Sequence, residues 1–185
     1  PNQPNENGTL QNDVAAYLAQ QGEGAFPHVV HRLDKETSGV VLFAKNPFVL
    51  PILGRLLEQK EIFRKYQAIV EGRLDKDLTI RKKIGRHRHD RRKRTIDERN
   101  GQEAITHVKV YQANKNQSQI YCILETGRTH QIRVHLASIQ HPIVGDPLYN
   151  EHSHAKRLML HAYQMHLTHP FTKEKLMITS KEKLF

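Results

Sequence analysis

The sequence predicts a mixed α/β protein of the α+β kind, built on a largely antiparallel sheet with flanking helices and loops. Three observations support this class. Several apolar, β-branched runs are separated by polar stretches or by glycine. Apolar residues at helical spacing occur only in a few short segments. The chain has 185 residues, of which 37% are hydrophobic, and this suits one domain with its own core.

The N-terminal part is expected to hold one helix and one buried strand. Residues 1–9 are polar and contain two prolines, which indicates an irregular lead-in. Helical spacing of apolar residues predicts a helix from residue 10, with Gly22 as its stop. "PHVVHRLD", residues 27–34, is a short extended piece. The apolar run Val40–Ala44 follows it and is typical of a strand buried on both faces.

A second helix is expected after that strand. Asn46 and Pro47 resemble an N-cap followed by a first-turn proline, so helix should run through about residue 61. Pro51 conflicts with this start. Either the helix begins later, or its first turn loses one hydrogen bond.

The remaining elements are expected in the order strand, basic loop or hairpin tip, two strands, helix, loop and two strands. Their ranges are 65–72, 81–95, 104–113, 118–127, 129–140, 141–150, 157–170 and 175–180.

The charge of the chain is strongly basic, with a formal net charge of +10 and a pI near 9.8. Residues 81–95 hold nine Lys or Arg residues and a single acid, Asp90. Phosphate contacts would offset the self-repulsion of such a segment, so nucleic acid is the first expected partner. We assign phosphate binding to Arg91, Arg92 and Lys93; the alternative is a loop that only improves solubility. Without amphipathic helix character, the segment does not favour a membrane surface.

Composition also limits the compartment and the cofactors. No stretch reaches the roughly 18 apolar residues of a membrane span, and no signal peptide opens the chain. The single cysteine, Cys122, indicates a reducing compartment, which we take to be the cytoplasm, and it should be a small core residue. Motifs for nucleotides, dinucleotides and zinc are absent, so we expect no metal and no cofactor. A serine hydrolase using Ser38 would lack its usual glycine-flanked turn.

Two stretches carry the chemistry: "HRLDKETSG" (31–39) and "GRTHQIRVHLASIQHPIVGDPLY" (127–149). With "RKYQAIVEG" (64–72) and "LMLHAYQMHLTHPFTKE" (158–174), they closely resemble the RluA-type family of RNA pseudouridine synthases. The motifs occur in order from about residue 8 to residue 180. Three features depart from the family. The strand before the first helix is missing, as is any upstream S4-type module, and Arg94 stands where the family often has methionine.

The resemblance implies one pseudouridine synthase catalytic domain over 1–185 that isomerises uridine in RNA. Large-subunit ribosomal RNA is the first expected target, and transfer RNA is the second. The reaction consumes nothing and needs no cofactor. Asp34 would be the nucleophile or transition-state partner. Because burial raises the pKa of carboxylates in general, such a group needs a cation, and the family resemblance gives this role to Arg133. A phosphate contact is the alternative for Arg133.

Further binding residues follow from the same resemblance. Tyr66 would offer a ring to the uracil and a hydroxyl for proton handling, with strand packing as its alternative. Arg32 would enter the space left by the flipped base, or else contact a phosphate or an acid. Leu160 would close the pocket. We also assign Arg128 and His130 to substrate or RNA binding, and we expect His31 and His130 to orient neighbours rather than act as acids or bases.

Two rival functions remain open at this point. The first is a domain of this fold that holds RNA without turnover; replacement of Asp34 or Arg133 would favour it, and both residues are present. A metal-dependent nuclease would need clustered acids, which the motifs lack. We further expect a monomer.

Overall fold

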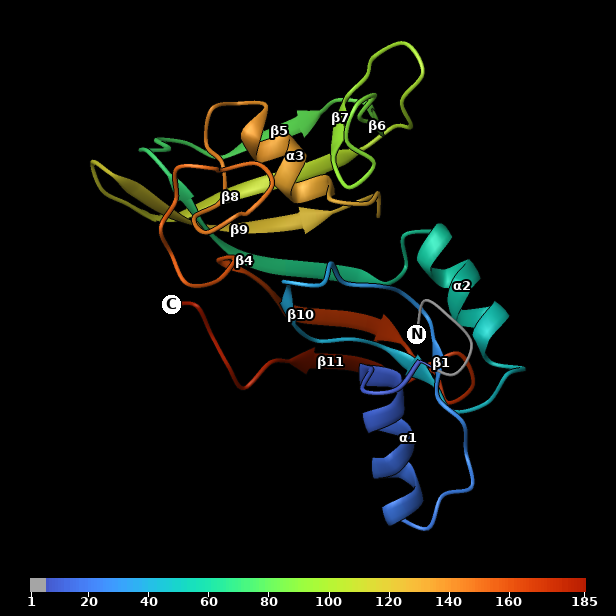
Figure 1. Ribbon diagram of the computed structural model, residues 1–185. Helices are drawn as coiled ribbons and strands as arrows, with labels where there is room; N and C mark the ends of the chain where they lie inside the picture. The colour runs from blue at the N-terminus through green and yellow to red at the C-terminus, as the bar shows by residue number, and fades with distance from the viewer. Residues whose placement is uncertain (1–5) are drawn as a thin grey trace.

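The computed structural model describes residues 6–185 (Figure 1), so part of the predicted lead-in, residues 1–5, lies outside the described residues. The helices are α1 (Leu10–Gln20), α2 (Leu50–Glu58) and α3 (Gln131–Ala137). The strands are β1 (His28–Val29), β2 (Ser38–Gly39), β3 (Phe43–Ala44), β4 (Phe63–Glu71), β5 (Leu78–Arg81), β6 (Ile84–Arg86), β7 (Arg94–Ile96), β8 (Ile105–Ala113), β9 (Gln117–Leu124), β10 (Leu160–Thr168) and β11 (Lys175–Thr179).

A seven-stranded sheet forms the centre of the molecule. Its strands follow the order β11-β10-β4-β9-β8-β5, and β2 pairs with β10 beside this path. All of these pairs are antiparallel except β2 with β10. Two small antiparallel pairs, β1 with β3 and β6 with β7, lie outside the sheet. The architecture confirms the predicted α+β class.

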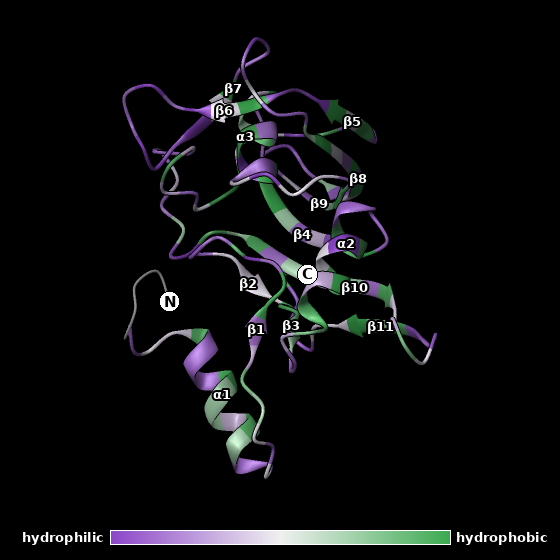
Figure 2. Ribbon diagram, turned by 90° about the vertical axis from the view of Figure 1, so that its right-hand side faces the viewer, coloured by the Kyte–Doolittle hydropathy of each residue, from purple (hydrophilic) through white to green (hydrophobic). Residues whose placement is uncertain are grey.

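The core lies mainly on one face of this sheet, under α3. Ala68 and Val70 of β4 and Ile120 of β9 are fully buried and pack with Leu136 of α3. A second cluster joins α2 to the edge of the sheet, where Leu53 packs with neighbouring apolar side chains. α1 extends away from the sheet in both views (Figures 1 and 2). The cavity described in the next subsection has no lining residue from α1.

Cys122 is a core residue, as predicted. It has no exposed surface, and burial raises the pKa of its thiol to about 12. The thiol is therefore protonated and unreactive at neutral pH.

The predicted strand Val40–Ala44 is wrong as a single element. Only Phe43 and Ala44 form a strand, β3, and they pair with β1. The backbone N–H of Val40 instead donates to the carbonyl of Ala162 in β10, at 2.9 Å. The run thus crosses from one sheet to another. Burial on both faces is not borne out either, because only Ala44 is buried and residues 40–43 are partly buried.

The second helix begins later than its cap signal predicted. Its first residue is Leu50, and Pro51 lies in its first turn, where a missing N–H costs no helical bond. Asn46 is not the N-cap; its side chain accepts a hydrogen bond from the N–H of Phe48 at 2.8 Å, within a turn. Of the two alternatives, the later start is confirmed.

The basic segment forms a hairpin. β6 and β7 pair antiparallel, with Arg86 opposite Arg94, and residues 87–93 form the connecting loop. This agrees with the predicted loop or hairpin tip. The loop is largely hydrophilic (Figure 2).

Candidate active site

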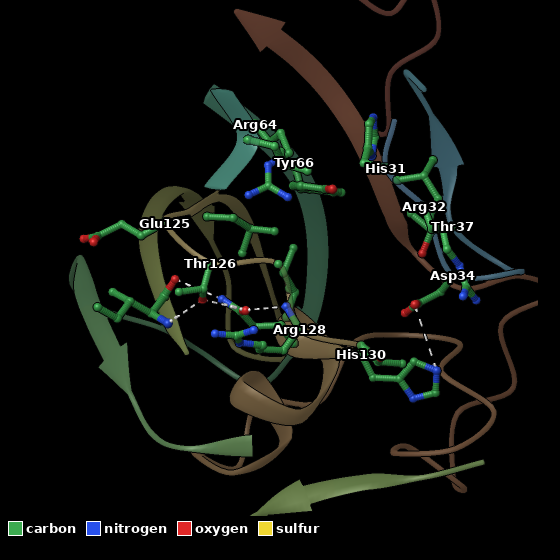
Figure 3. A pocket seen from close by; sticks show the side chains of 18 of the residues that line it. His31, Arg32, Asp34, Thr37, Arg64, Tyr66, Glu125, Thr126, Arg128 and His130 are labelled. Carbon is green, nitrogen blue, oxygen red and sulfur yellow. Dashed lines mark hydrogen bonds and ion pairs between the residues drawn. The ribbon is translucent and has the colours of Figure 1, made fainter. Parts of the chain in front are cut away.

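A cavity of about 700 Å³ opens between β4, the start of α3 and the segment after β1. Figure 3 shows Arg64 and Tyr66 on one wall, with Asp34 and His130 across from them. The following residues singled out from the sequence line the cavity: Arg32, Asp34, Tyr66, Arg128, His130, Arg133 and Leu160. Arg91, Arg92 and Lys93 do not line it.

Asp34 begins a tight turn that leads into β2. The N–H of Thr37 donates to the carbonyl of Asp34 at 3.0 Å, as in a β-turn. Gly39 then adopts φ +116°, and a side chain there would overlap the backbone carbonyl of Ala162. Only glycine allows this close approach of β2 to β10. The approach fixes the position of the Asp34 turn relative to β10.

Asp34 and Arg133 come together from positions 99 residues apart. Arg133 Nη1 lies 3.3 Å from Asp34 Oδ2 and 3.9 Å from Glu36 Oε2. The Arg133 side chain is 1% exposed, whereas that of Asp34 is 21% exposed and faces the cavity. The carboxylate is therefore accessible to a ligand while its cation is not.

Asp146 was missed in the sequence, and it binds Arg133 more closely than Asp34 does. Both Asp146 oxygens accept from the guanidinium, from Nε and Nη2, each at 2.8 Å. Oδ1 also accepts from the N–H groups of Leu148 and Tyr149. The only sequence signal was the position of Asp146 in "GDPLY", where it resembles an ordinary turn residue. This fork-to-fork geometry fixes the plane of the guanidinium and its direction toward Asp34.

Arg133 keeps its positive charge because of the carboxylates of Asp146 and Asp34. Burial alone would lower the pKa of the guanidinium. The hydrogen bonds and negative charge of Asp146, with a smaller contribution from Asp34, outweigh burial and raise that pKa. Arg133 is thus a permanent cation behind Asp34.

His130 connects the cavity to the basic hairpin. It adopts a left-handed backbone, φ 57°, immediately before α3. Its Nε2 lies 4.0 Å from Asp34 Oδ1, and its Nδ1 lies 2.9 Å from the hydroxyl of Tyr149. That hydroxyl accepts from the N–H of Arg94 in β7 at 2.7 Å. Burial lowers the pKa of His130, so the imidazole is neutral at neutral pH.

The wall across from Asp34 is formed by adjacent strands. Tyr66 of β4 is 6% exposed and Leu160 of β10 is 3% exposed, and both line the cavity. Burial raises the pKa of Tyr66, and the charge of Asp34 adds to this, while Arg64 opposes it. Tyr66 is therefore a neutral phenol whose ring and hydroxyl can contact a ligand in the cavity.

His31 orients a neighbour, which agrees with the expectation for it. Its Nε2 accepts from the N–H of Leu42 at 3.1 Å. Burial, aided by the charge of Arg64, lowers the pKa of His31 to about 4. The ring is thus neutral at neutral pH, and an uncharged Nε2 is what this hydrogen bond requires.

The two remaining arginines lie at the rim. Arg32 is exposed beside Asp34. Arg128 is also exposed, and its Nε donates to the carbonyl of Glu103 at 3.0 Å. Both can meet a large polyanion at the mouth of the cavity.

Part of the hairpin charge is neutralised within the protein. Arg92 donates to both oxygens of Asp90, and this lowers the pKa of that acid to about 2. Lys93 pairs with Glu151 at 3.0 Å. The side chain of Arg91 is exposed and has no ion-pair partner among residues 6–185. Of the three predicted phosphate contacts, Arg91 is the one whose charge stays available.

Within residues 6–185, no three histidine, cysteine, aspartate or glutamate side chains are grouped so that they could hold a metal ion. None of the helices in this range is long and apolar enough to cross a membrane.

Comparison with known proteins relates this chain to RNA pseudouridine synthases. The family model described as RNA pseudouridylate synthase matches residues 2–138. A Bacillus subtilis protein named uncharacterized RNA pseudouridine synthase YhcT is 44% identical over 178 residues, which cover 94% of this chain and 59% of the relative. The ribosomal large subunit pseudouridine synthase D of Nitrosomonas europaea is 40% identical over 180 residues, covering 92% and 52%.

A solved structure is also similar. Human RNA pseudouridylate synthase domain containing 1 superposes with a TM-score of 0.79 at 27% identity, covering 94% of this chain and 74% of the human chain. The chain spans 59% of the length of the Bacillus subtilis relative and 52% of the length of the Nitrosomonas europaea relative.

Proposed function

The chain belongs to the RNA pseudouridylate synthase family, and on that premise we propose that it converts uridine in RNA to pseudouridine, with Asp34 as the reacting carboxylate. The approach of Arg133 Nη1 to within 3.3 Å of Asp34 Oδ2 is the observation that supports this function most directly. It pairs an accessible carboxylate with a buried cation inside a cavity large enough for one nucleotide.

In this reaction the bond from N1 of uracil to C1′ of ribose breaks, the base turns, and C5 bonds to C1′. C5 then loses its proton to water and N1 takes up a proton, so that the product is an isomer of uridine. Asp34 contacts the reacting nucleotide as nucleophile or transition-state partner. Arg133 stabilises the negative charge of the carboxylate, and Asp146 keeps the guanidinium in place. Tyr66 holds the uracil with its ring, and Leu160 closes the apolar side.

The uridine must leave its stack to reach Asp34, since the carboxylate lies inside the cavity. Flipping a base costs a few kcal/mol and is least costly for a base that is already unpaired. Arg32 stands at the mouth beside Asp34 and is exposed, so it is suited to enter the space that the base leaves. We therefore assign to Arg32 the stabilisation of the opened RNA.

The basic hairpin is assigned to the RNA backbone. Arg91 offers the available charge, and the link from Arg94 through Tyr149 to His130 ties the hairpin to the cavity. Phosphate contacts position the RNA without reading its sequence. Several relatives carry the name ribosomal large subunit pseudouridine synthase D, so we propose large-subunit ribosomal RNA as the target.

Release of tritium tests the function. Total RNA carrying 5-tritiated uridine is incubated with the protein, and tritium in the water is counted. We expect release in the presence of a metal chelator and without added nucleotide, because the proposed chemistry uses only side chains of this chain. RNA binding without release would identify a binding domain instead, and strict dependence on a metal would contradict the mechanism.

A further inference from the structure

Arg64 is a buried arginine whose charge has no partner. It lies on β4, two residues before Tyr66, and is only 7% exposed. Its guanidinium points into the cavity (Figure 3). Among residues 6–185 its side chain makes no hydrogen bond or ion pair, and its Nε is buried without an acceptor. In contrast, the other buried arginine of the cavity, Arg133, donates hydrogen bonds to two carboxylates, Asp34 and Asp146.

The neighbours of Arg64 do not neutralise it. Glu125 also lines the cavity, but its oxygens already bind Lys60 at 2.8 Å and His107 at 2.6 Å. His31 is a neutral ring, and the charge of Arg64 helps to keep it so. A buried charge without a partner is costly, and burial correspondingly lowers the pKa of the Arg64 guanidinium.

The local backbone approaches this guanidinium closely at a glycine. Gly127 lies against it, and a Cβ at that position would be 2.9 Å from Arg64 Nη1. Glycine at this position therefore keeps the loop from pressing a side chain against the guanidinium, and both Gly127 and Arg64 line the cavity. A small acceptor group entering from the cavity can reach the guanidinium.

We infer that Arg64 binds a phosphate group of the RNA backbone next to the uridine that occupies the cavity. Only an anion neutralises a buried cation, and uracil is uncharged, so a phosphate satisfies Arg64 where a base carbonyl does not. The planar fork of arginine matches phosphate oxygens in pairs. Residues two apart on a strand are about 7 Å apart on the same face, so one nucleotide can contact both Tyr66 and Arg64.

This inference rests on the proposed function and adds a specific contact to it. The hairpin holds exposed charge at a distance from the cavity, whereas Arg64 would bind one phosphate beside the reacting nucleotide. The contact would form only where a phosphate lies at the correct distance from the base in the cavity. It would thereby favour a nucleotide within an RNA chain over a free nucleoside.

Binding of short RNA with neutralised phosphates tests the inference. The probe is a labelled single-stranded heptamer with one central uridine, in which the phosphate on either side of the uridine is replaced, one at a time, by an uncharged methylphosphonate. We expect the wild-type protein to lose about tenfold in affinity for one of these two probes. Arg64→Gln should bind the unmodified probe about tenfold more weakly and lose nothing further with either modified probe.

Arg73→Gln is the matched control, because Arg73 is an exposed arginine just beyond the other end of β4. It should behave like the wild type with all three probes. Equal sensitivity of Arg64→Gln and the wild type to the methylphosphonates would overturn the inference. If Arg64→Gln does not fold, Arg64→Lys decides, since it keeps the charge without the fork. Arg64→Lys should bind the unmodified probe more weakly than the wild type and still lose affinity for one methylphosphonate probe. If Arg64→Lys binds as tightly as the wild type and binds all three probes equally, the inference is also overturned.

The outcome is independent of turnover. A protein that releases no tritium but shows this probe pattern would keep the Arg64 contact and lose the proposed reaction. A protein that releases tritium and shows no difference between the probes would keep the reaction and lose the contact.

Discussion

Arg133 stands between two carboxylates with different surroundings. Asp146 is completely buried and binds the guanidinium with both oxygens, whereas Asp34 is partly exposed and contacts a single nitrogen. A buried ion pair adds little net stability, but removing one partner leaves the other charge unpaired and is strongly destabilising. We therefore regard Asp146 as a positioning residue, which acts on the reaction only through Arg133.

Asp146→Asn should lower kcat for tritium release at least tenfold while leaving RNA affinity unchanged, because the amide cannot hold both guanidinium nitrogens. We also expect unfolding free energy to fall by roughly 3–5 kcal/mol. Kinetics and chemical denaturation measure the two effects. Asp75→Asn, at an exposed pair with Arg73, should change neither. Unchanged kcat in a folded Asp146→Asn protein would remove Asp146 from the account.

His31 gives the fold a pH dependence whose sign follows from its lowered pKa. The pKa falls from 6.5 to about 4 on folding, so the unfolded chain binds more protons between these values. The contribution of neutral His31 to the free energy of unfolding is fully present above pH 6.5. This contribution is lost as the pH falls from 6.5 toward 4. The loss amounts to roughly 3 kcal/mol.

His31→Gln should therefore show a smaller drop in Tm between pH 6.5 and pH 4 than the wild type. The exposed His154→Gln should follow the wild-type curve. Parallel curves for His31→Gln and the wild type would show that His31 does not carry this dependence.

The residues of the site were unequally accessible to sequence reasoning. Asp34, Tyr66 and Arg133 lie in motifs distinctive enough to be named, and all three line one cavity. Asp146 and Arg64 were missed for different reasons. Asp146 has the appearance of a turn acid, and the absence of a partner for Arg64 is a property of three-dimensional surroundings that no local pattern encodes.

At the scale of elements, the β6–β7 hairpin and the crossing at β2 connect the site to the sheet. The hairpin reaches the cavity through the Tyr149 hydroxyl, which bonds both Arg94 and His130. The crossing holds the Asp34 turn against β10 through parallel pairing of Ser38 with His161. A change in the hairpin or in β2 should therefore alter the position of the Asp34 carboxylate.

Replacing Arg91, Arg92 and Lys93 together with alanine should weaken RNA binding and flatten its dependence on salt. Each lost phosphate contact lowers the slope by about 0.7 for single-stranded RNA. We expect a change nearer one contact than three, because Arg92 and Lys93 already pair with acids of the protein. Binding measured over a range of salt concentrations gives the slope.

The control for this variant removes the same charge elsewhere. Arg73, Lys76 and Lys115 are exposed in loops at the other end of the strands. Their joint replacement with alanine should leave the salt slope near that of the wild type. Equal slopes for the hairpin variant and the wild type would mean that the hairpin does not contact phosphates.

Gly39→Ala should destabilise the protein by about 2 kcal/mol or more, because the new methyl group meets the Ala162 carbonyl at a left-handed φ. Gly54 in α2 is the matched control, because a Cβ added there would have no atom within 4 Å. Gly54→Ala should stabilise the helix by roughly 0.5–1 kcal/mol. Thermal melting distinguishes the two, and equal melting temperatures for both variants would contradict the tight crossing.

Long strands were predicted better than short ones. β4, β8, β9 and β10 each combine apolar residues with turn signals at their ends, and all four occur close to their predicted ranges. The run Val40–Ala44 was misleading because its apolar residues pass between two sheets, where residues 40–43 are only partly buried. Pairing in such a run is decided by tertiary hydrogen bonds, such as that from Val40 to Ala162.

At the scale of the whole molecule, the antiparallel sheet brings residues from distant parts of the chain to one cavity. Asp34 and Arg133 are 99 positions apart, and no local element predicts their separation in space. The fold class followed from composition and periodicity, whereas the meeting of the two motifs followed from family resemblance. We propose that the chain acts as one catalytic domain, while its bacterial relatives are longer.

The most direct test of the central claim compares Asp34 variants for both tritium release and RNA binding. Asp34→Asn and Asp34→Ala should release no tritium above background from RNA carrying 5-tritiated uridine, while binding that RNA within a few-fold of the wild type. The matched control is Asp77→Asn, at an exposed carboxylate between β4 and β5, which should keep full release. Persistent tritium release by either Asp34 variant would contradict the assignment of Asp34 as the reacting carboxylate.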